Sequence, residues 1–527
     1  MRRIVALCLC AFLLFGFCAV SSADTMAAYE RNEKGYPDLK GETFTVWAYN
    51  RKSNVTNDYG DYECVKAVER LLNCNIEFVH PPVGQEQDNF AIMMAGDRLP
   101  DLLFCNSVDN FYPGGVQVAY ADGILYDYTD LINETNTPNF VNIVLKDEFL
   151  SKAVYDDTGR IVRLGAKLCG GEVADFQFSG PVVRRDFLAQ TGMDLPETIE
   201  DWYTLLTAMK DAGVEYPLAV SKGYGLSVFS TAWGIFASAA SNGYTVGEDG
   251  EIVFGPYTDA YKDYLAEMNR WYMEGLINPD YMNTTDDNVV AMIMNDRVGS
   301  ANLHVWNWEY VIIPGFELDH PEKQLVAAQL PKLNAGDPLT NLRSSGRSLG
   351  DYKYITADAK NPLACVTLLD ALYFEEISTL FGFGIEGTGW TVKNGFPIAI
   401  NVPETEPLDV QLKGAITEWH AYEDWDADMI LQNKYCTNGV PDAMKLWREC
   451  PTDGCLSKFI MLTTEEAEVR GKRAADITTY VNEMQLKFIT GAEPLENFEA
   501  YRAQLRELGV EEMIAVYQAA QTRFIER

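Results

Sequence analysis

The stretch Glu42-Thr-Phe-Thr-Val-Trp-Ala-Tyr49 alternates polar and apolar side chains and is rich in residues that favour extended backbone. Alternation with period two predicts a β-strand. Apolar residues at helical spacing follow over 62–72, then a second strand over 75–79 and a short helix over 90–95. The run Pro100-Asp-Leu-Leu-Phe-Cys105 is almost continuously apolar, as in a strand covered on both faces. This β-α-β-α-β order predicts an α/β lobe with a doubly wound sheet.

A second lobe is expected to begin near residue 162. Thr198, followed by acidic residues and by Asp201 three positions on, predicts a helix start with a capping box. Aromatic and apolar residues recur at helical spacing over 257–272 and predict a core face rather than a cofactor site. The last segment is expected to be helical and to break at Gly491 and at Gly509.

The N-terminus has the pattern of a secretory signal peptide. Met1-Arg2-Arg3 precedes an apolar run over 4–20, and small residues lead to a cleavage site after Ala23. The apolar run is too short for a comfortable membrane span. We therefore expect an exported protein, periplasmic or at the cell surface. A lipid anchor at Cys18 is disfavoured, because the phenylalanines before it suit such a cleavage poorly.

The chain is long and strongly acidic. Its 527 residues point to two or more domains or lobes. The formal net charge of −35 disfavours nucleic acid and anionic membranes as partners, because like charges repel. The sequence has four histidines and no CxxC pair, so neither a metal site nor a cofactor is predicted.

Eight of the eleven cysteines remain after the predicted cleavage. An even number in an exported protein allows disulfides. A local bridge between Cys450 and Cys455 is expected, because the intervening Pro and Gly can turn the chain. Cys105 and Cys365 lie in apolar stretches and are expected to be buried thiols.

Two tryptophans close the stretch Val298-Gly-Ser-Ala-Asn-Leu-His-Val-Trp306-Asn-Trp308. Strand ends in open α/β sheets are where ligands bind, and a flat ring suits the apolar face of a sugar. The alternative is that both rings belong to the core. Residues i and i+2 share one face of a strand, so both rings face a ligand only if the strand continues to Trp308. If the chain turns after Trp306, Trp308 packs beneath it.

Several short motifs then occur in a characteristic order along almost the whole chain. With them, the chain resembles the extracellular solute-binding proteins of ABC importers, in the carbohydrate-binding family 1 that includes maltose- and alginate-oligosaccharide-binding proteins. The motifs are Phe90-Ala-Ile-Met-Met-Ala-Gly-Asp97 with Leu99-Pro-Asp-Leu-Leu-Phe104, Arg184-Arg-Asp-Phe-Leu188 with Leu195-Pro-Glu-Thr198, Trp271-Tyr-Met-Glu-Gly-Leu-Ile-Asn-Pro279, Phe383-Gly-Ile-Glu-Gly387 and Phe488-Ile-Thr-Gly-Ala-Glu-Pro494.

The resemblance implies a two-lobed periplasmic-binding-protein fold of class II, with hinge strands between the lobes and a helical C-terminus. It further implies a non-enzymatic, monomeric protein that captures an oligosaccharide in an aromatic-lined cleft and delivers it to a membrane permease. The expected division is a signal peptide over 1–23, a first lobe from 24–160 and 326–382, and a second lobe from 161–325 and 383–527.

The resemblance also implies which residues line the cleft. Arg343 is a candidate to clamp a carboxylate, although solvated loop arginines are the commoner case. Alginate-type relatives carry a calcium loop, which the sequence 211–217 is too short and too poor in ligands to form. The ligand-binding candidates are Trp47, Tyr49, Asn106, Asp109, Tyr224, Trp233, Trp306, Trp308, Arg343 and Trp390.

Two other functional classes are compatible with the sequence. A secreted glycoside hydrolase would need two carboxylates facing a scissile bond, and the sequence singles out no such pair. A binding protein for a peptide or an organic acid would use the same fold, because a fold alone does not fix the ligand.

Overall fold

The computed structural model describes residues 28–50, 56–105, 107–165, 167–169, 178–222, 225–239, 243–340, 342, 348–393, 396–400, 416, 419, 439–451, 454–457 and 459–527. The predicted signal peptide and three ligand-binding candidates, Asn106, Tyr224 and Arg343, lie outside these residues. Within the described ranges, no helix combines the length and the apolar composition that crossing a bilayer requires.

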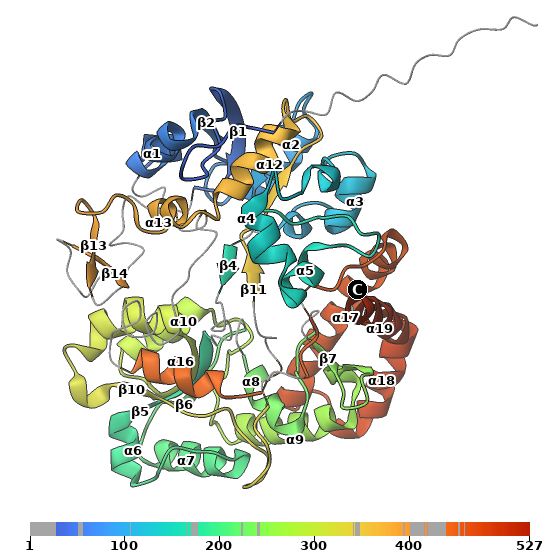
Figure 1. Ribbon diagram of the computed structural model, residues 1–527. Helices are drawn as coiled ribbons and strands as arrows, with labels where there is room; N and C mark the ends of the chain where they lie inside the picture. Colours follow the sequence, from blue (N-terminus) through green and yellow to red (C-terminus); the bar gives the residue numbers. More distant parts are fainter. Residues whose placement is uncertain are drawn as a thin grey trace, which may run out of the picture.

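The first lobe, in the upper part of Figure 1, is built on a four-stranded mixed sheet with the order β12-β3-β1-β2. β1 is parallel to β2 and β3, whereas β12 comes from much later in the chain and is antiparallel to β3. The predicted β-α-β-α-β order is confirmed. The elements are β1 (Glu42–Ala48), α1 (Glu63–Leu72), β2 (Cys74–Val79), α2 (Glu86–Met94), β3 (Leu102–Phe104), α3 (Gly115–Ala121), α4 (Pro138–Phe140), α5 (Glu148–Val154), β12 (Lys353–Ile355), α12 (Pro362–Ala371) and α13 (Glu375–Phe383).

The second lobe contains a second four-stranded sheet with the order β10-β5-β9-β6. β9 is parallel to β6 and antiparallel to β5, which is also antiparallel to β10. The elements are β5 (Ser179–Arg184), α6 (Arg185–Thr191), α7 (Ile199–Asp211), β6 (Tyr216–Ala219), α8 (Ser227–Ser230), β7 (Tyr244–Val246), β8 (Ile252–Phe254), α9 (Asp259–Met273), α10 (Asp286–Met294), β9 (Val298–His304), α11 (Val305–Asn307), β10 (Leu325–Ala327) and α16 (Val440–Arg448).

Local signals account for two helices of this lobe, α7 and α9. Thr198 and Asp201 form the predicted capping box at the start of α7. The predicted core face on α9 is buried through Tyr261, Tyr264 and further residues at helical spacing. Because both features depend on residues within one or two helical turns, the sequence pattern was sufficient to predict them.

The chain passes between the lobes through two short strands that pair with each other. β4 (Lys167–Cys169) leads out of the first lobe, and β11 (Ser348–Gly350) leads back into it. Figure 1 shows this pair between the two sheets. A hairpin of β13 (Trp390–Lys393) and β14 (Phe396–Ala399) follows α13.

Three helices complete the chain: α17 (Thr464–Thr490), α18 (Phe498–Glu507) and α19 (Val510–Glu526). The predicted breaks at Gly491 and Gly509 are confirmed, and both glycines have positive φ, 75° and 93°. Such backbone favours glycine, because a Cβ is disfavoured there.

Buried side chains form one core cluster in the first lobe and two in the second. The first-lobe cluster draws on residues within 36–164 and 349–381 and also takes in Ile416, Trp419, Phe459, Met461 and Phe524. Residues 325–330 pack with the second lobe through Leu325, Ala328 and Leu330. The lobe boundaries expected from the sequence stay a proposal, and this packing favours a return to the first lobe after residue 330.

The expected bridge between Cys450 and Cys455 is not formed in the described residues, which corrects that prediction. Cys450 follows α16 and is buried in a second-lobe cluster, whereas the backbone of Cys455 pairs with Thr245 at the edge of β7. Their neighbours therefore hold them in different elements. Cys105 and Cys365 are buried thiols, as predicted.

Candidate ligand-binding site

The topology of the second sheet brings three aromatic side chains to one edge. Parallel strands β6 and β9 end at this edge, and antiparallel β5 begins there. Ser179 pairs with His304, so Phe178, just before β5, lies beside the end of β9. Trp306 lies two residues after His304, at the same edge. This carboxyl edge is where open α/β sheets bind ligands.

The geometry of Trp306 follows from a turn in the chain. β9 ends at His304, and the imidazole Nδ1 of His304 accepts a hydrogen bond of 3.2 Å from the backbone N–H of Trp306. Trp306 is left 53% exposed. Its centroid lies 5.0 Å from that of His304 and 6.4 Å from that of Phe178, and the latter two rings are stacked. We call Phe178, His304 and Trp306 the aromatic platform.

Trp308 has different surroundings from Trp306. It begins a π-helical segment, Trp308–Glu317, and its ring is fully buried in the third core cluster. The indole N–H donates to Oε1 of Glu317 at 2.8 Å. The chain therefore turns after Trp306, and the described conformation offers a ligand no surface on Trp308.

Glu317 is the buried acid to which Trp308 donates. Its Oε1 also accepts the backbone N–H of Leu325 at 3.0 Å, so one carboxylate ties the π-helical segment to the start of β10. Its Oε2 has no hydrogen-bond partner among the described residues. Burial raises the pKa of Glu317 to about 7, although its two hydrogen bonds and Arg185 act in the opposite direction.

The first lobe presents a corresponding edge where β1 and β3 end. Trp47 is fully buried near this edge, and its indole N–H donates to Oδ1 of Asn89 at 2.9 Å. Tyr49, just past β1, is half-buried, and its ring lies 5.5 Å from that of Phe111. The half-buried Phe111 was missed by our sequence reasoning, because it lies six residues past the end of the predicted strand.

Asp109 is exposed, and both carboxylate oxygens make local hydrogen bonds. Oδ1 accepts the backbone N–H of Val116 at 2.8 Å, and Oδ2 accepts the hydroxyl of Ser107 at 2.8 Å. A Cβ at Gly115 would lie 2.4 Å from Oδ1. Through these two hydrogen bonds and its close contact with Gly115, Asp109 stabilises the loop between β3 and α3.

The remaining two tryptophan candidates differ in exposure. Trp233 is half-buried, with its ring centroid 5.7 Å from that of Tyr264. Trp390 is 6% exposed and donates its indole N–H to the carbonyl of Gly384 at 2.9 Å. Trp233 therefore retains surface for a ligand, whereas Trp390 has little.

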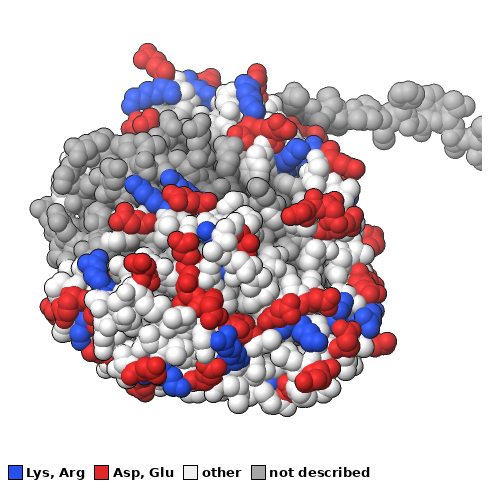
Figure 2. All heavy atoms as spheres, turned by 90° about the horizontal axis from the view of Figure 1, so that it is seen from below, with Lys and Arg blue, Asp and Glu red and all other residues white. Residues whose placement is uncertain are grey.

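The sequence predicted Trp306 as a candidate but missed Phe178 and His304. Phe178 and His304 come together through the pairing of β5 with β9, and a single sequence does not reveal that pairing. Across the described residues, no group of three or more His, Cys, Asp or Glu side chains is placed to hold a metal ion. Figure 2 shows the acidic character of the chain on the face seen from below, where acidic side chains form the larger share of the charges.

Two curated relatives, both of Bacillus subtilis (strain 168), match part of the chain. Lipoprotein LipO is 26% identical over 227 residues, which are 41% of this chain and 41% of LipO. The polygalacturonan/rhamnogalacturonan-binding protein YtcQ is 19% identical over 335 residues, which are 61% of this chain and 62% of YtcQ. The chain thus matches less than two thirds of the length of either relative.

Solved structures share the fold over nearly the whole chain. An HMO-binding, ABC-transporter-associated solute-binding protein of Bifidobacterium longum infantis superposes with a TM-score of 0.74, at 17% identity, over 92% of this chain and 99% of its own. The alginate-binding protein AlgQ2 superposes with a TM-score of 0.69, at 19% identity, over 92% of this chain and 98% of its own. Both confirm the predicted two-lobed fold.

The family assignment comes from the sequence itself. Residues 66–376, more than half of the chain, match the family model of bacterial extracellular solute-binding proteins. Members of this family bind substrates and are not enzymes, which agrees with the prediction. This protein belongs to the bacterial extracellular solute-binding proteins.

Proposed function

We propose that this protein captures an oligosaccharide between its two lobes and delivers it to the permease of an ABC transporter. The observation that carries the proposal is the half-exposed indole of Trp306 at the carboxyl edge of the second sheet. A flat apolar ring face at this edge suits the C–H face of a pyranose.

The surroundings of Trp306 support a sugar as the ligand. His304 and Phe178 back the ring, so it loses little side-chain freedom when a ligand stacks on it. The related YtcQ and AlgQ2 are described as binding polysaccharides or alginate, which favours the same class of ligand here.

The candidates divide into contacts and supports in this proposal. Trp306 is the main stacking residue. Trp47, Trp308 and Trp390 are supports, because the described conformation buries them. Tyr49, Asp109 and Trp233 keep exposed surface and are further proposed contacts. The candidates outside the described residues are also proposed contacts: Asn106, Tyr224 and Arg343. Export by a signal peptide cleaved after Ala23, and a monomeric state, belong to the same proposal.

The test is a thermal-shift and calorimetric survey of neutral and uronic-acid oligosaccharides, with peptides and organic acids in parallel. We expect binding of at least one glycan without turnover. In Trp306→Ala, the affinity for that glycan should fall by roughly 30-fold or more, as for a dominant aromatic contact. A matched control is Val311→Ala, which truncates another exposed apolar residue of the following segment and should leave affinity unchanged. Stabilisation by peptides or organic acids, with none by any glycan, would contradict the proposal.

A further inference from the structure

The last helix of the chain belongs to both lobes. In its first half, Val510, Met513 and Tyr517 pack into a core cluster of the second lobe. Near its end, Phe524 packs into the core cluster of the first lobe. Because α19 is continuous from Val510 to Glu526, one rigid element is embedded in two cores.

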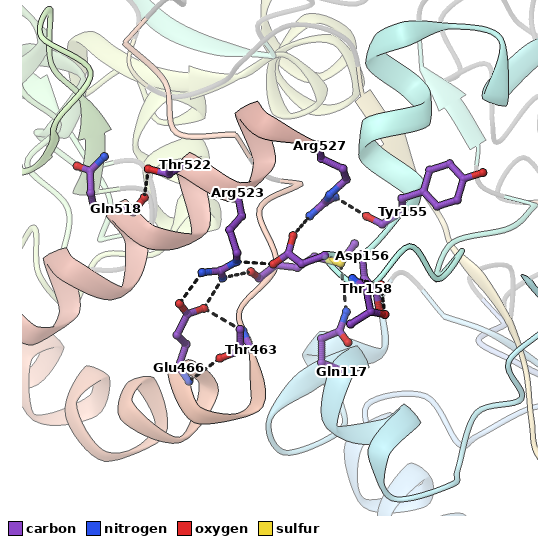
Figure 3. A network of polar contacts seen from close by, with 12 residues as sticks. Gln117, Tyr155, Asp156, Thr158, Thr463, Glu466, Gln518, Thr522, Arg523 and Arg527 are labelled. Carbon is purple, nitrogen blue, oxygen red and sulfur yellow. Dashed lines mark hydrogen bonds and ion pairs between the residues drawn. The ribbon is translucent and has the colours of Figure 1, made fainter.

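An aspartate of the first lobe holds the end of this helix. Asp157 lies in the tight turn between Tyr155 and Ile161, whose backbones pair. Its Oδ2 accepts from Nε of Arg523 at 2.6 Å, and its Oδ1 accepts from the guanidinium of Arg527. Figure 3 shows both arginines reaching from the last turn of the helix toward this turn of the first lobe.

The turn that carries Asp157 is itself fixed. The buried side chain of Asp156 accepts hydrogen bonds from the backbone N–H groups of Thr158, at 2.8 Å, and Arg160, at 2.9 Å. An aspartate that closes a turn in this way restricts the backbone around it. Asp157 is therefore presented to the helix from a rigid loop.

Arg523 also reaches the start of α17. Its two terminal nitrogens bind the carboxylate of Glu466 at 2.8 and 2.5 Å. Glu466 closes the capping box of α17 with Thr463, whose backbone N–H it accepts at 2.9 Å. One guanidinium thus joins the first turn of α17, the last turn of α19 and the first lobe.

Further bonds fasten the C-terminal end of α19 to α5. Arg527 donates to the carbonyl of Lys152 at 2.7 Å and to that of Tyr155. In return, the ammonium of Lys152 donates to the carbonyl of Ile525 at 3.1 Å. Carbonyls in the last turn of a helix lack partners within the helix, so these bonds stabilise it where it meets the first lobe.

The four charged side chains are largely shielded from solvent. Arg523, Asp157, Glu466 and Arg527 are 27%, 19%, 15% and 11% exposed, respectively. Paired, partly buried guanidinium–carboxylate contacts are stronger than exposed ion pairs, which contribute little. The exposed pair of Glu468 and Lys472, on the surface of α17, is of that weaker kind.

We propose that the last turn of α19 is the fixed point about which the two lobes move, and that Asp157, Arg523 and Arg527 are positioning residues for ligand capture. Most of α19 packs in the second lobe and only its last turn packs in the first, so the motion that disturbs this packing least is a rotation of the first lobe about that turn. The paired strands β4 and β11 are another described connection between the lobes, and together with the last turn of α19 they define a rotation axis. The proposal rests on the proposed function in one respect: the ligand is held between the lobes.

The experiment measures the distance between the lobes in the full chain without any ligand. Spin labels are placed on non-canonical residues introduced at the exposed positions Ile92 in α2 and Met273 in α9, and the distance distribution is recorded by double electron–electron resonance. Asp157→Asn keeps the shape of the side chain but removes its charge. The matched control, Glu468→Gln, removes a charge of the same sign from the exposed pair on α17.

We expect a broader distribution in Asp157→Asn than in the natural sequence and an unchanged distribution in Glu468→Gln. Arg527→Gln keeps the pair between Asp157 and Arg523 and should broaden the distance distribution less. This variant replaces Asp157→Asn in the experiment if Asp157→Asn does not fold. Equal widths in Asp157→Asn or Arg527→Gln and the control would overturn the proposal. Since no sugar is present, this outcome is independent of whether glycans bind. If they do, affinity should fall by roughly 3- to 30-fold in Asp157→Asn, as for a residue that acts at a distance.

Discussion

At the scale of single residues, Trp306 and Trp308 separate ligand contact from core packing. Trp308→Ala removes a fully buried indole and its bond to Glu317, and should destabilise the fold by about 3–5 kcal/mol. Trp306→Ala truncates a ring that is already half-exposed and should change the free energy of unfolding by less than about 0.5 kcal/mol. Chemical denaturation of both variants provides the measurement. Similar losses of unfolding free energy in the two variants would mean that Trp306 is a core residue.

Glu317 should make stability depend on pH in the neutral range. Its pKa of about 7 in the folded protein lies above its ordinary value, so the folded state holds the proton more tightly. The resulting stabilisation is fully present below the ordinary pKa of a glutamate and is lost as the pH rises through about 7.

The test is Glu317→Gln, which keeps an acceptor for Trp308 and Leu325 but cannot ionise. Between about pH 5 and about pH 8, the natural sequence should lose up to about 3 kcal/mol more unfolding free energy than the variant. Denaturant titrations across this range give both profiles. Parallel profiles would show that Glu317 stays in one protonation state.

Part of this site was predictable from the sequence. The run from Val298 identified a buried strand followed by a large ring, because that pattern is local. The turn after His304 could not be predicted from the sequence. It depends on the hydrogen bond from Trp306 to the His304 ring and on the bond from Trp308 to Glu317, nine residues further along the chain. Such bonds become visible only when the chain is folded.

At the scale of elements, one glycine shows how α16 covers the second sheet. A Cβ at Gly180, in β5, would lie 2.2 Å from the ring of Trp447, which donates its indole N–H to the carbonyl of Ala328. Gly180→Ala should therefore cost about 1–3 kcal/mol through overpacking. Gly350→Ala is the control, because that strand glycine has nothing within 4 Å among the described residues. Thermal unfolding of the two variants compares them, and equal midpoints would mean that Trp447 moves aside at no cost.

Elements were predictable where their signals are local. The capping box of α7 and the breaks at Gly491 and Gly509 each depend on a few neighbouring residues. β12 joins the first sheet after a separation of some 250 residues from β3, and no local pattern announces that pairing. The same limit explains the failed prediction for Cys450 and Cys455, whose partners in the fold come from distant segments.

At the scale of the whole molecule, the net charge of −35 acts on any ligand that approaches the protein. A protein of this charge repels an anionic sugar over distances comparable with the Debye length and leaves a neutral sugar unaffected. The dependence of affinity on salt therefore reports the charge of the natural ligand. If cationic side chains cluster at the site, the affinity for an anionic sugar would fall with added salt, because salt would then weaken an attraction.

We predict that a neutral oligosaccharide binds with the same affinity at about 10 mM and at about 0.5 M NaCl, since no net charge pair forms with the protein. A uronic-acid oligosaccharide should bind more tightly as salt is added, because the repulsion is screened, and the gain should appear mainly in the association rate. Calorimetry and stopped-flow fluorescence at both ionic strengths measure the two quantities. Weaker binding of the uronic-acid ligand at high salt would instead identify a local cationic site that outweighs the acidic surface, and would make Arg343 the first residue to replace.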